Sequence, residues 1–185
     1  DYGFNSQLIH YSGHHDQYGA ATVPIYQTST FAFASAQDGA DCFAGVKPGY
    51  MYTRIGNPTV KALERQVALL EHACDSVALA SGMAAVSCVY LALLNAGDHV
   101  VSSSAVYGAS RVLMEQHMSR FGVESTYVNT ADIDAVKAAI KPNTKMIYIE
   151  TPANPTMEIS DIAACAEIAH KAGALLVVDN TFCSP

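Results

Sequence analysis

The sequence has no run of basic residues, and its formal net charge is −7 at pH 7. An acidic surface disfavours nucleic acids and anionic membranes as partners. No stretch approaches the roughly 18 consecutive apolar residues of a membrane helix. The first residues, "DYGFNSQLIHYSGHH", have no apolar central region, so we expect no signal peptide. These absences predict a soluble protein of the cytoplasm.

Paired cysteines are also missing. None of the cysteines forms a CxxC motif and no N-glycosylation sequon occurs; the five cysteines are Cys42, Cys74, Cys88, Cys165 and Cys183. We therefore expect reduced, mostly buried thiols rather than a disulfide framework or a zinc site. His14 and His15 are adjacent, but no third ligand stands at a suitable spacing, so no metal site is predicted.

The glycine fingerprints of nucleotide sites are absent. Neither GxGxxG nor GxxxxGK(S/T) occurs, which disfavours a dinucleotide or nucleoside-triphosphate site. What the sequence does contain is typical of a globular protein, because half of its 185 residues are hydrophobic and 15% are charged. This length and balance allow one domain of ordinary size with a proper core.

The chain has an irregular first part and a regular second part. Residues 1–50 are rich in Gly, Gln, Tyr, Ser and His, and they predict an extended arm in which 23–31 lies across another segment. Residues 51–185 predict an alternation of strands (76–80, 99–103, 124–128, 145–150 and 174–179) with helices (56–72, 81–97, 107–122, 132–140 and 160–173). Strands that alternate with helices indicate an α/β fold with a mostly parallel sheet and flanking helices.

Four features follow the expected strands, where ligands bind in open α/β sheets. They are the Ser81-Gly82-Met83 turn, Tyr107, Asn154 and Asp179. Taken singly, each has a simpler structural explanation, which is respectively a capped turn, a core or surface aromatic, a turn residue and a helix N-cap.

Together the four features fit a flat, phosphorylated, heteroaromatic molecule. A helix N-terminus at Gly82 can bind a phosphate, Tyr107 can stack on a ring, and Asn154 can hydrogen-bond a ring oxygen. Asp179 can pair with a protonated ring nitrogen. Pyridoxal phosphate chemistry requires such a carboxylate, because the protonated ring then acts as an electron sink.

Several segments carry a resemblance to a known family, in the family's order and over nearly the whole chain: "PIYQTSTF" (24–31), "YTRIGNPT" (52–59), "LASGMAA" (79–85), "GDHVV" with "VYGAS" (97–101 and 106–110), "ETPANPT" (150–156) and "VVDNTF" (177–182). The chain resembles the pyridoxal-phosphate enzymes of cysteine and methionine metabolism. This resemblance implies pyridoxal 5'-phosphate as the cofactor and the aspartate-aminotransferase-like fold, fold type I. It also implies that 51–185 is an incomplete large cofactor-binding domain preceded by the arm, 1–50.

The resemblance implies roles for individual residues. The Ser81-Gly82-Met83 turn would bind the cofactor phosphate through its backbone N–H groups. Tyr107 would stack on the pyridine ring and act on the leaving group. Asn154 would bond the ring hydroxyl oxygen, and Asp179 would pair with the ring nitrogen.

Other implied parts of the site lie on a second subunit or outside the chain. Tyr52 and Arg54 would reach the phosphate of the neighbouring subunit, which makes a dimer necessary and a homotetramer the expected assembly. The family's Schiff-base lysine lies some tens of residues beyond the segment that matches "VVDNT". We therefore expect this chain to be the N-terminal part of a longer one. We interpret Lys137, Lys141 and Lys145 as surface charges and Lys171 as a cation in the last turn of a helix.

Within the family, "ETPANPTM" is most similar to the methionine γ-lyases. This implies elimination at the γ carbon of L-methionine or a related sulfur amino acid, giving 2-oxobutanoate, ammonia and a thiol. Those enzymes usually have a cysteine two residues after the stacking tyrosine, where this sequence has Ala109. Cystathionine γ-lyase activity and γ-replacement of the O-acetylhomoserine sulfhydrylase type are the alternatives. An alternative of another class is a non-catalytic pyridoxal-phosphate-like binding module.

Overall fold

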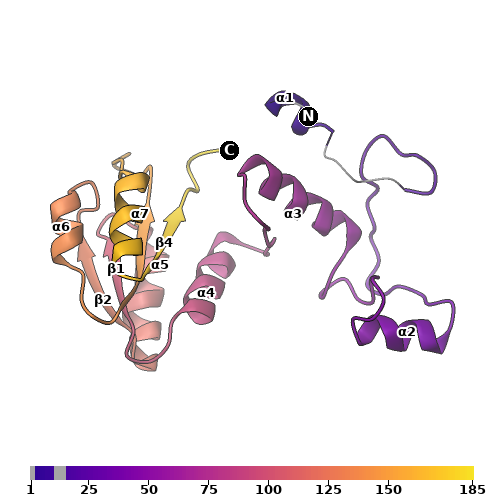
Figure 1. The fold of residues 1–185 in the computed structure, drawn as a ribbon, viewed down its shortest axis with the longest axis horizontal. Helices are drawn as coiled ribbons and strands as arrows, with labels where there is room; N and C mark the ends of the chain where they lie inside the picture. Colours follow the sequence, from indigo (N-terminus) through magenta and orange to yellow (C-terminus); the bar gives the residue numbers. More distant parts are fainter. Residues whose placement is uncertain (1–2, 11–15) are drawn as a thin grey trace. The chain divides into compact units, whose positions relative to one another are not determined.

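The computed structural model describes residues 3–10 and 16–185, and these residues form two compact units (Figure 1). One unit reaches to Ala78 and includes Pro185; the other is Leu79–Ser184. The described part of the first unit contains the helices α1 (Phe4–Gln7), α2 (Ala36–Phe43) and α3 (Pro58–Leu70), joined by irregular segments. The division of the whole protein at residue 50 into an arm and a domain stays a prediction.

In the first unit, the segment 23–31 runs alongside 51–59. Thr30 and Tyr52 form an antiparallel bridge, and the backbone N–H of Phe31 donates to the carbonyl of Met51 at 3.1 Å. The side chain of Asn57 donates to the carbonyl of Tyr26 at 2.8 Å, and its oxygen caps α3 by accepting from the backbone of Thr59. The expectation that this segment lies across another one is therefore confirmed.

The second unit contains a four-stranded parallel sheet, formed by β1 (His99–Ser103), β2 (Glu124–Val128), β3 (Thr144–Glu150) and β4 (Leu175–Asp179). The strand order is β2-β1-β3-β4, and every neighbouring pair is parallel. The carboxyl ends of all four strands therefore meet at one edge. The predicted α/β fold with a mostly parallel sheet is confirmed.

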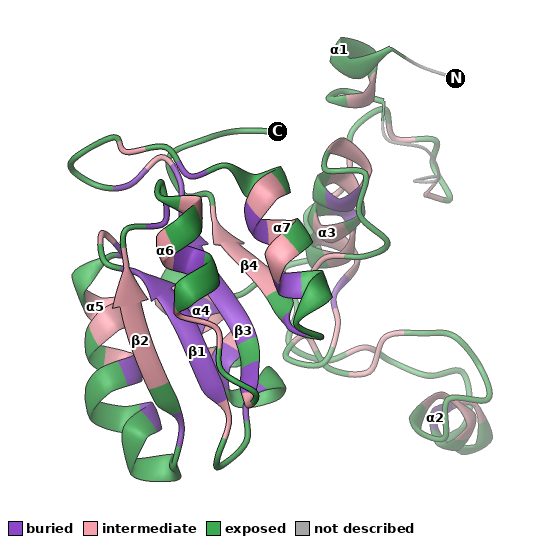
Figure 2. Ribbon diagram, turned by 60° about the vertical axis from the view of Figure 1, so that its left-hand side comes forward, coloured by how far each residue is buried: buried purple, intermediate pink, exposed green. Residues whose placement is uncertain are grey.

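Helices cover both faces of this sheet (Figure 2). One face carries α4 (Gly82–Leu93) and a helical stretch that begins as α5 (Gly108–Val112), continues as a π-helical segment (Leu113–His117) and ends as a 3-10 segment (Met118–Phe121). The other face carries α6 (Ile133–Ala138) and α7 (Ile162–Lys171). Gly122 closes the long stretch with φ 80°, a left-handed conformation that favours glycine. The helix expected over 81–97 ends earlier, at Leu93.

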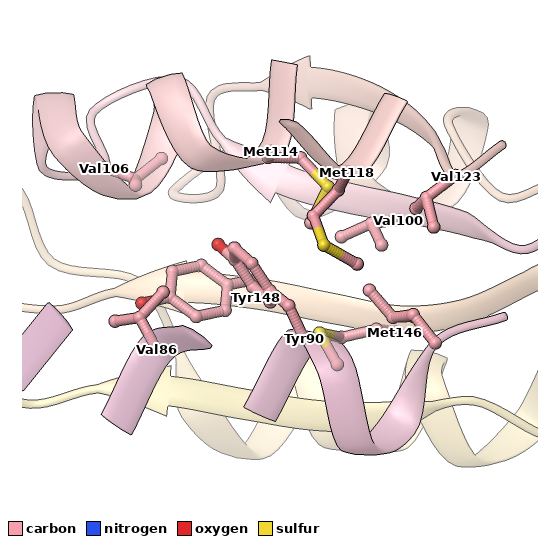
Figure 3. Close-up of a cluster of buried hydrophobic side chains, with 10 residues drawn as sticks. Val86, Tyr90, Val100, Val106, Met114, Met118, Val123, Met146 and Tyr148 are labelled. Carbon is pink, nitrogen blue, oxygen red and sulfur yellow. The ribbon is translucent and has the colours of Figure 1, made fainter. Parts of the chain in front are cut away.

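The core has two halves because neighbouring residues of a strand face opposite sides of the sheet. On one side, Val100, Met146 and Tyr148 pack against Tyr90 and Met114 (Figure 3). The other side is formed by residues of β1, β3 and the two remaining helices: Val101, Ile147, Ile149, Val136, Cys165 and Ala169. The inner strand β3 is thus buried on both faces, and its last residue, Glu150, lies at the carboxyl edge.

The strand expected over 76–80 is wrong, because this segment is irregular. The segment is hydrogen-bonded to Glu64 of α3 instead of to another strand. The N–H of Ala78 donates to Glu64 Oε1 at 3.0 Å, and the Ser76 hydroxyl donates to the Glu64 carbonyl at 2.6 Å. An apolar run takes up strand structure only where a neighbouring strand pairs with it, and in the described part of the chain none pairs with this run.

All five cysteines are free, as expected, but the expectation that most are buried is wrong. Only Cys165, on the inner face of α7, is buried, whereas Cys74, Cys88 and Cys183 are exposed. Cys88 lies on the outer side of α4, and the other two exposed cysteines lie in irregular segments. In the described ranges, no helix is both long and apolar enough to cross a bilayer.

Candidate active site

A cavity of about 690 Å³ lies at the carboxyl edge of the sheet in the second unit. Its wall combines the ends of β3 and β4, the first turn of α4 and the loop after β1. The lining includes all six residues that the sequence predicted in this unit: Ser81, Gly82, Met83, Tyr107, Asn154 and Asp179. The volume is that of a small-molecule site.

The first turn of α4 supplies backbone donors to the cavity. Ser81 is the N-cap, and its side chain accepts a hydrogen bond from the N–H of Ala84 at 3.1 Å. Gly82 and Met83 follow at the first two helical positions, where no carbonyl lies one turn earlier to accept their N–H groups. A Cβ placed on Gly82 would meet no atom within 4 Å, so the space beside this turn is open. The turn can therefore bind an anion through free N–H groups.

Tyr107 and Asn154 come to the cavity on two different loops. Tyr107 follows β1 and precedes α5, and its side chain is half exposed. Asn154 follows β3 and is also exposed. Both loops are held by Glu150, which accepts from the backbone N–H of Tyr107 at 2.6 Å and from that of Asn154 at 3.0 Å.

Asp179 is the last residue of β4, and its carboxylate has defined partners. Oδ2 accepts from the hydroxyl of Tyr148 at 3.1 Å, and Oδ1 accepts from the backbone and hydroxyl of Thr181 at 3.2 and 2.5 Å. Burial raises the pKa of Tyr148, so its hydroxyl keeps the proton that it donates. Residues 180–185 form no helix, so Asp179 does not cap a helix that begins at residue 180. It is an oriented carboxylate at the cavity wall.

Glu150 and Tyr148 also line the cavity, although neither is among the predicted site residues. Glu150 has the same sequence signal as Asp179, because each is an acidic residue at the end of an expected strand. In the sheet, Glu150 and Asp179 are register partners on neighbouring strands. Tyr148 lies two residues before Glu150, so the period of a strand places both side chains on one face.

The wall of the cavity is acidic. It contains the carboxylates Glu150 and Asp179 and, among the described residues, no lysine, arginine or histidine. Three of the lysines form ion pairs elsewhere on the surface, as predicted: Lys137 with Asp134, Lys141 with Glu124 and Lys171 with Glu167. An anionic ligand at this wall can be bound by backbone N–H groups. A cationic side chain that contacts the same ligand would come from another part of the protein.

Tyr52 and Arg54 belong to the first unit. The Arg54 guanidinium carbon lies 5.0 Å from the centroid of the Tyr52 ring, a cation–π arrangement, and both residues are exposed. Their predicted contact with a phosphate in a neighbouring subunit stays a prediction. His14 and His15 lie outside the described residues. Within residues 3–10 and 16–185, no three His, Cys, Asp or Glu side chains gather as metal ligands.

The fold and the cavity together define an α/β protein with a cavity of small-molecule size at the carboxyl edge of a parallel sheet. More specifically, the chain belongs to the family of Cys/Met metabolism PLP-dependent enzymes, whose sequence profile matches residues 5–185. The resemblance inferred from the sequence motifs is therefore confirmed.

Individual relatives agree with this membership. An L-methionine gamma-lyase of Fusobacterium nucleatum subsp. polymorphum is 46% identical over 185 residues, which are 100% of this chain and 47% of that protein. A cystathionine gamma-lyase of Bacillus subtilis is 48% identical over 167 residues, which are 90% of this chain and 42% of that protein. The chain thus spans about half the length of these relatives.

A solved structure is similar over almost the whole chain. It is a Campylobacter jejuni protein described as an O-acetylhomoserine (thiol)-lyase, which carries N'-pyridoxyl-lysine-5'-monophosphate. The TM-score is 0.88 at 30% identity, and the match covers 97% of this chain and 44% of that one.

The residues at the cavity fit the pyridoxal phosphate of this family. The α4 turn offers N–H donors suited to a phosphate. Tyr107 offers an aromatic face, Asn154 an amide and Asp179 a carboxylate, and these are the groups that a pyridinium ring with a hydroxyl oxygen would require.

Proposed function

We propose that the whole protein is a PLP-dependent carbon–sulfur lyase that eliminates a thiol from the γ carbon of L-methionine or a related sulfur amino acid. The products are 2-oxobutanoate, ammonia and the thiol. The observation that carries this proposal is the carboxylate of Asp179, held by Tyr148 at the wall of a cavity that also contains the α4 turn, Tyr107 and Asn154.

Each residue has one task in the proposed site. The N–H groups of Gly82 and Met83 bind the phosphate, and Ser81 keeps the turn in place as the helix cap. Tyr107 lies against one face of the pyridine ring, and Asn154 donates to the ring hydroxyl oxygen. Asp179 holds the proton on the ring nitrogen.

The chemistry depends on that proton. Pyridoxal phosphate, when bound, supplies an electron sink for the α carbon of the amino acid, and a protonated ring nitrogen makes that sink effective. Asp179 keeps the nitrogen protonated because a carboxylate within hydrogen-bond reach favours the cation. In the proposed reaction, the Tyr107 hydroxyl gives a proton to the sulfur that leaves from the γ carbon.

The acidic wall supports a homo-oligomeric enzyme. A phosphate in this cavity meets no cationic side chain of the described wall, so the charge of Arg54 from a neighbouring subunit would complete its binding. A dimer is then the smallest active form and a homotetramer the proposed assembly. We place the protein in the cytoplasm, which the five free thiols support.

Two related activities compete with methionine elimination. The identity to a cystathionine gamma-lyase, 48%, is no lower than that to a methionine gamma-lyase, 46%, so relatedness does not choose between them. Ala109, which stands where methionine γ-lyases usually have cysteine, belongs to α5 and is not among the residues of the cavity wall. Elimination from cystathionine and γ-replacement with O-acetylhomoserine are therefore the alternatives to test beside methionine.

The first experiment is an absorption spectrum of the whole protein before and after addition of L-methionine. A band at about 420 nm, from the protonated cofactor bound to lysine, is expected. Formation of 2-oxobutanoate from methionine supports the lyase. If the band is present but methionine is not turned over, cystathionine and O-acetylhomoserine are assayed as substrates. If no band forms even with added pyridoxal phosphate, the cofactor assignment fails.

A pair of variants tests the central residue. Asp179→Asn keeps the shape of the side chain but removes its charge, and we expect kcat to fall about a hundredfold or more, as when a preorganised electrostatic contact is lost. Asp161→Asn is the matched control, because Asp161 is an exposed N-cap of α7 and asparagine caps as well as aspartate. Equal activity of the two variants would contradict the role of Asp179.

A further inference from the structure

Glu150 is the more deeply buried of the two carboxylates of the cavity wall, with 5% of its surface exposed. A carboxylate at such a position is costly unless it is paired or hydrogen-bonded. In the described part of the chain Glu150 forms no salt bridge. Two backbone N–H groups satisfy it instead.

The two donors come from the two loops that carry the ring contacts. Oε2 accepts from the N–H of Tyr107, which is 43 residues earlier in the chain, and Oε1 accepts from the N–H of Asn154. Each carboxylate oxygen therefore serves one loop. Since Glu150 is the last residue of β3, an inner strand that is buried on both faces, both loops are anchored to the core of the sheet.

We propose that Glu150 is a positioning residue that fixes Tyr107 and Asn154 relative to each other and to Asp179. This inference rests on the proposed function, in which Tyr107 and Asn154 contact the cofactor ring. In this proposal Glu150 acts through the backbone of these two residues, because its carboxylate oxygens accept from their N–H groups. Its register partner on β4 is Asp179, so one strand pairing sets the place of all three ring contacts.

The distinction from a purely structural role is testable, because a glutamine cannot replace both contacts. In Glu150→Gln the side chain keeps its size but has one oxygen and one NH₂ group. Whichever way the amide turns, one of the two backbone N–H groups faces a donor instead of an acceptor. One loop is then released while the other stays bound.

The experiment compares Glu150→Gln with Thr126→Val in the whole protein. Thr126 lies on β2, and its hydroxyl bonds Nε2 of the buried His99 at 2.8 Å, at the opposite, amino end of the sheet. Each variant removes one hydrogen bond of a buried side chain in the same unit, that of Glu150 or of His99. We expect Glu150→Gln to raise the Kd of the apoprotein for pyridoxal phosphate about tenfold, which corresponds to one hydrogen bond to a charged group. Its cofactor circular dichroism band is expected to weaken, because the ring environment is less ordered.

For Thr126→Val we expect a lower unfolding midpoint with unchanged cofactor Kd and circular dichroism. If both variants lose stability alike and Glu150→Gln binds pyridoxal phosphate as tightly as the unmodified protein, the positioning role is overturned. If the unmodified protein binds no pyridoxal phosphate, the proposed function fails first and this inference fails with it.

Amide hydrogen exchange of the unmodified protein provides a measurement that does not depend on how the variant folds. The N–H groups of Tyr107 and Asn154 are expected to exchange slowly, although both side chains are exposed, because they donate to a buried carboxylate. Exchange of either N–H at the rate of an unprotected peptide would overturn the proposal.

Discussion

The hydroxyl of Tyr148 donates a hydrogen bond of 3.1 Å to Oδ2 of Asp179, from the central strand β3 to the neighbouring strand β4. Both residues line the cavity, and the donor is almost completely buried, at 2% exposure, whereas the acceptor is only partly buried. A hydrogen bond from the core thus orients the carboxylate on which the proposed chemistry depends. This arrangement and three others lead to measurable consequences.

Tyr148→Phe is expected to reduce kcat about tenfold, because Asp179 loses one hydrogen bond to a charged group and with it part of its orientation. The free energy of unfolding should fall by only about 1 kcal/mol, since the ring remains in place. Steady-state kinetics and denaturant unfolding measure the two effects. Tyr127→Phe is the control, because Tyr127 packs against the same core half but does not line the cavity. An undiminished kcat in Tyr148→Phe would show that Thr181 alone orients Asp179.

Ser81→Ala and Asp161→Ala form a matched pair of helix caps. Each native side chain accepts from a backbone N–H three residues later, at 3.1 Å in α4 and 2.9 Å in α7. Each substitution should lower the free energy of unfolding by about 1 kcal/mol. Only Ser81→Ala is expected to weaken the binding of pyridoxal phosphate by the apoprotein, because α4 alone of these two helices begins at the cavity. Equal binding by both variants would argue against the α4 turn as the phosphate site.

His99 predicts a loss of stability in mild acid. It is fully buried between Thr144 and Thr126, whose hydroxyls bond its two ring nitrogens at 2.8 Å each. Burial lowers the pKa of His99 below its ordinary value near 6.5, and the positive charge of Lys141 adds to this. In the window below pH 6.5, the unfolded chain binds a proton that the folded chain does not.

The free energy of unfolding should therefore fall as the pH falls through this window, by at most about 1.4 kcal/mol per pH unit from this residue. Urea unfolding at pH 7, 6 and 5 measures the slope. His99→Gln should make the slope shallower, whereas replacement of the exposed His170 by glutamine should not. The same slope in His99→Gln would mean that other groups cause the acid sensitivity.

Tyr90 and Tyr148 predict the opposite behaviour in alkali. Their rings pack edge to face with centroids 5.4 Å apart, and burial raises the pKa of both hydroxyls above the ordinary value near 10. Above pH 10 the unfolded chain releases protons that the folded chain retains. Each tyrosine then costs about 1.4 kcal/mol of stability per pH unit. Unfolding midpoints at pH 9, 10 and 11 should show this fall, and the double replacement by phenylalanine should reduce it.

Much of the fold could be predicted from the sequence because its local signals agree. The runs at 99–103, 124–128, 145–150 and 174–179 are all strands, and Gly122 ends a helical stretch as expected. The failure at 76–80 has a physical reason. The sequence of an apolar run does not show whether another strand lies beside it. Here the backbone N–H of Ala78 donates a hydrogen bond to the side chain of Glu64 instead of to a strand.

The site was predictable where residue type and position after a strand together suggest the chemistry. Asp179 and the glycine turn are predictable because each follows an expected strand and because their residue types fit one ligand together; both line the same cavity. Glu150 and Tyr148 were not found, because their importance lies in which backbone N–H or carboxylate they reach. Contacts over 43 and 31 positions of the chain depend on the pairing of the strands, which one sequence does not specify.

The register of β3 with β4, which pairs Glu150 with Asp179, also limits how the length of this chain can change. Inserting one residue between Tyr148 and Glu150 would turn one of these side chains to the opposite face, because the side chains of a strand alternate. Either the bond to Asp179 or the anchoring of the Tyr107 loop would then be lost. The turn 141–143, at the amino end of β3, has its own contacts, because the carbonyl of Asn143 accepts from the N–H of His99 at 2.9 Å, but none of its residues lines the cavity. Insertions and deletions should therefore harm the cavity less at the amino edge of the sheet than at its carboxyl edge.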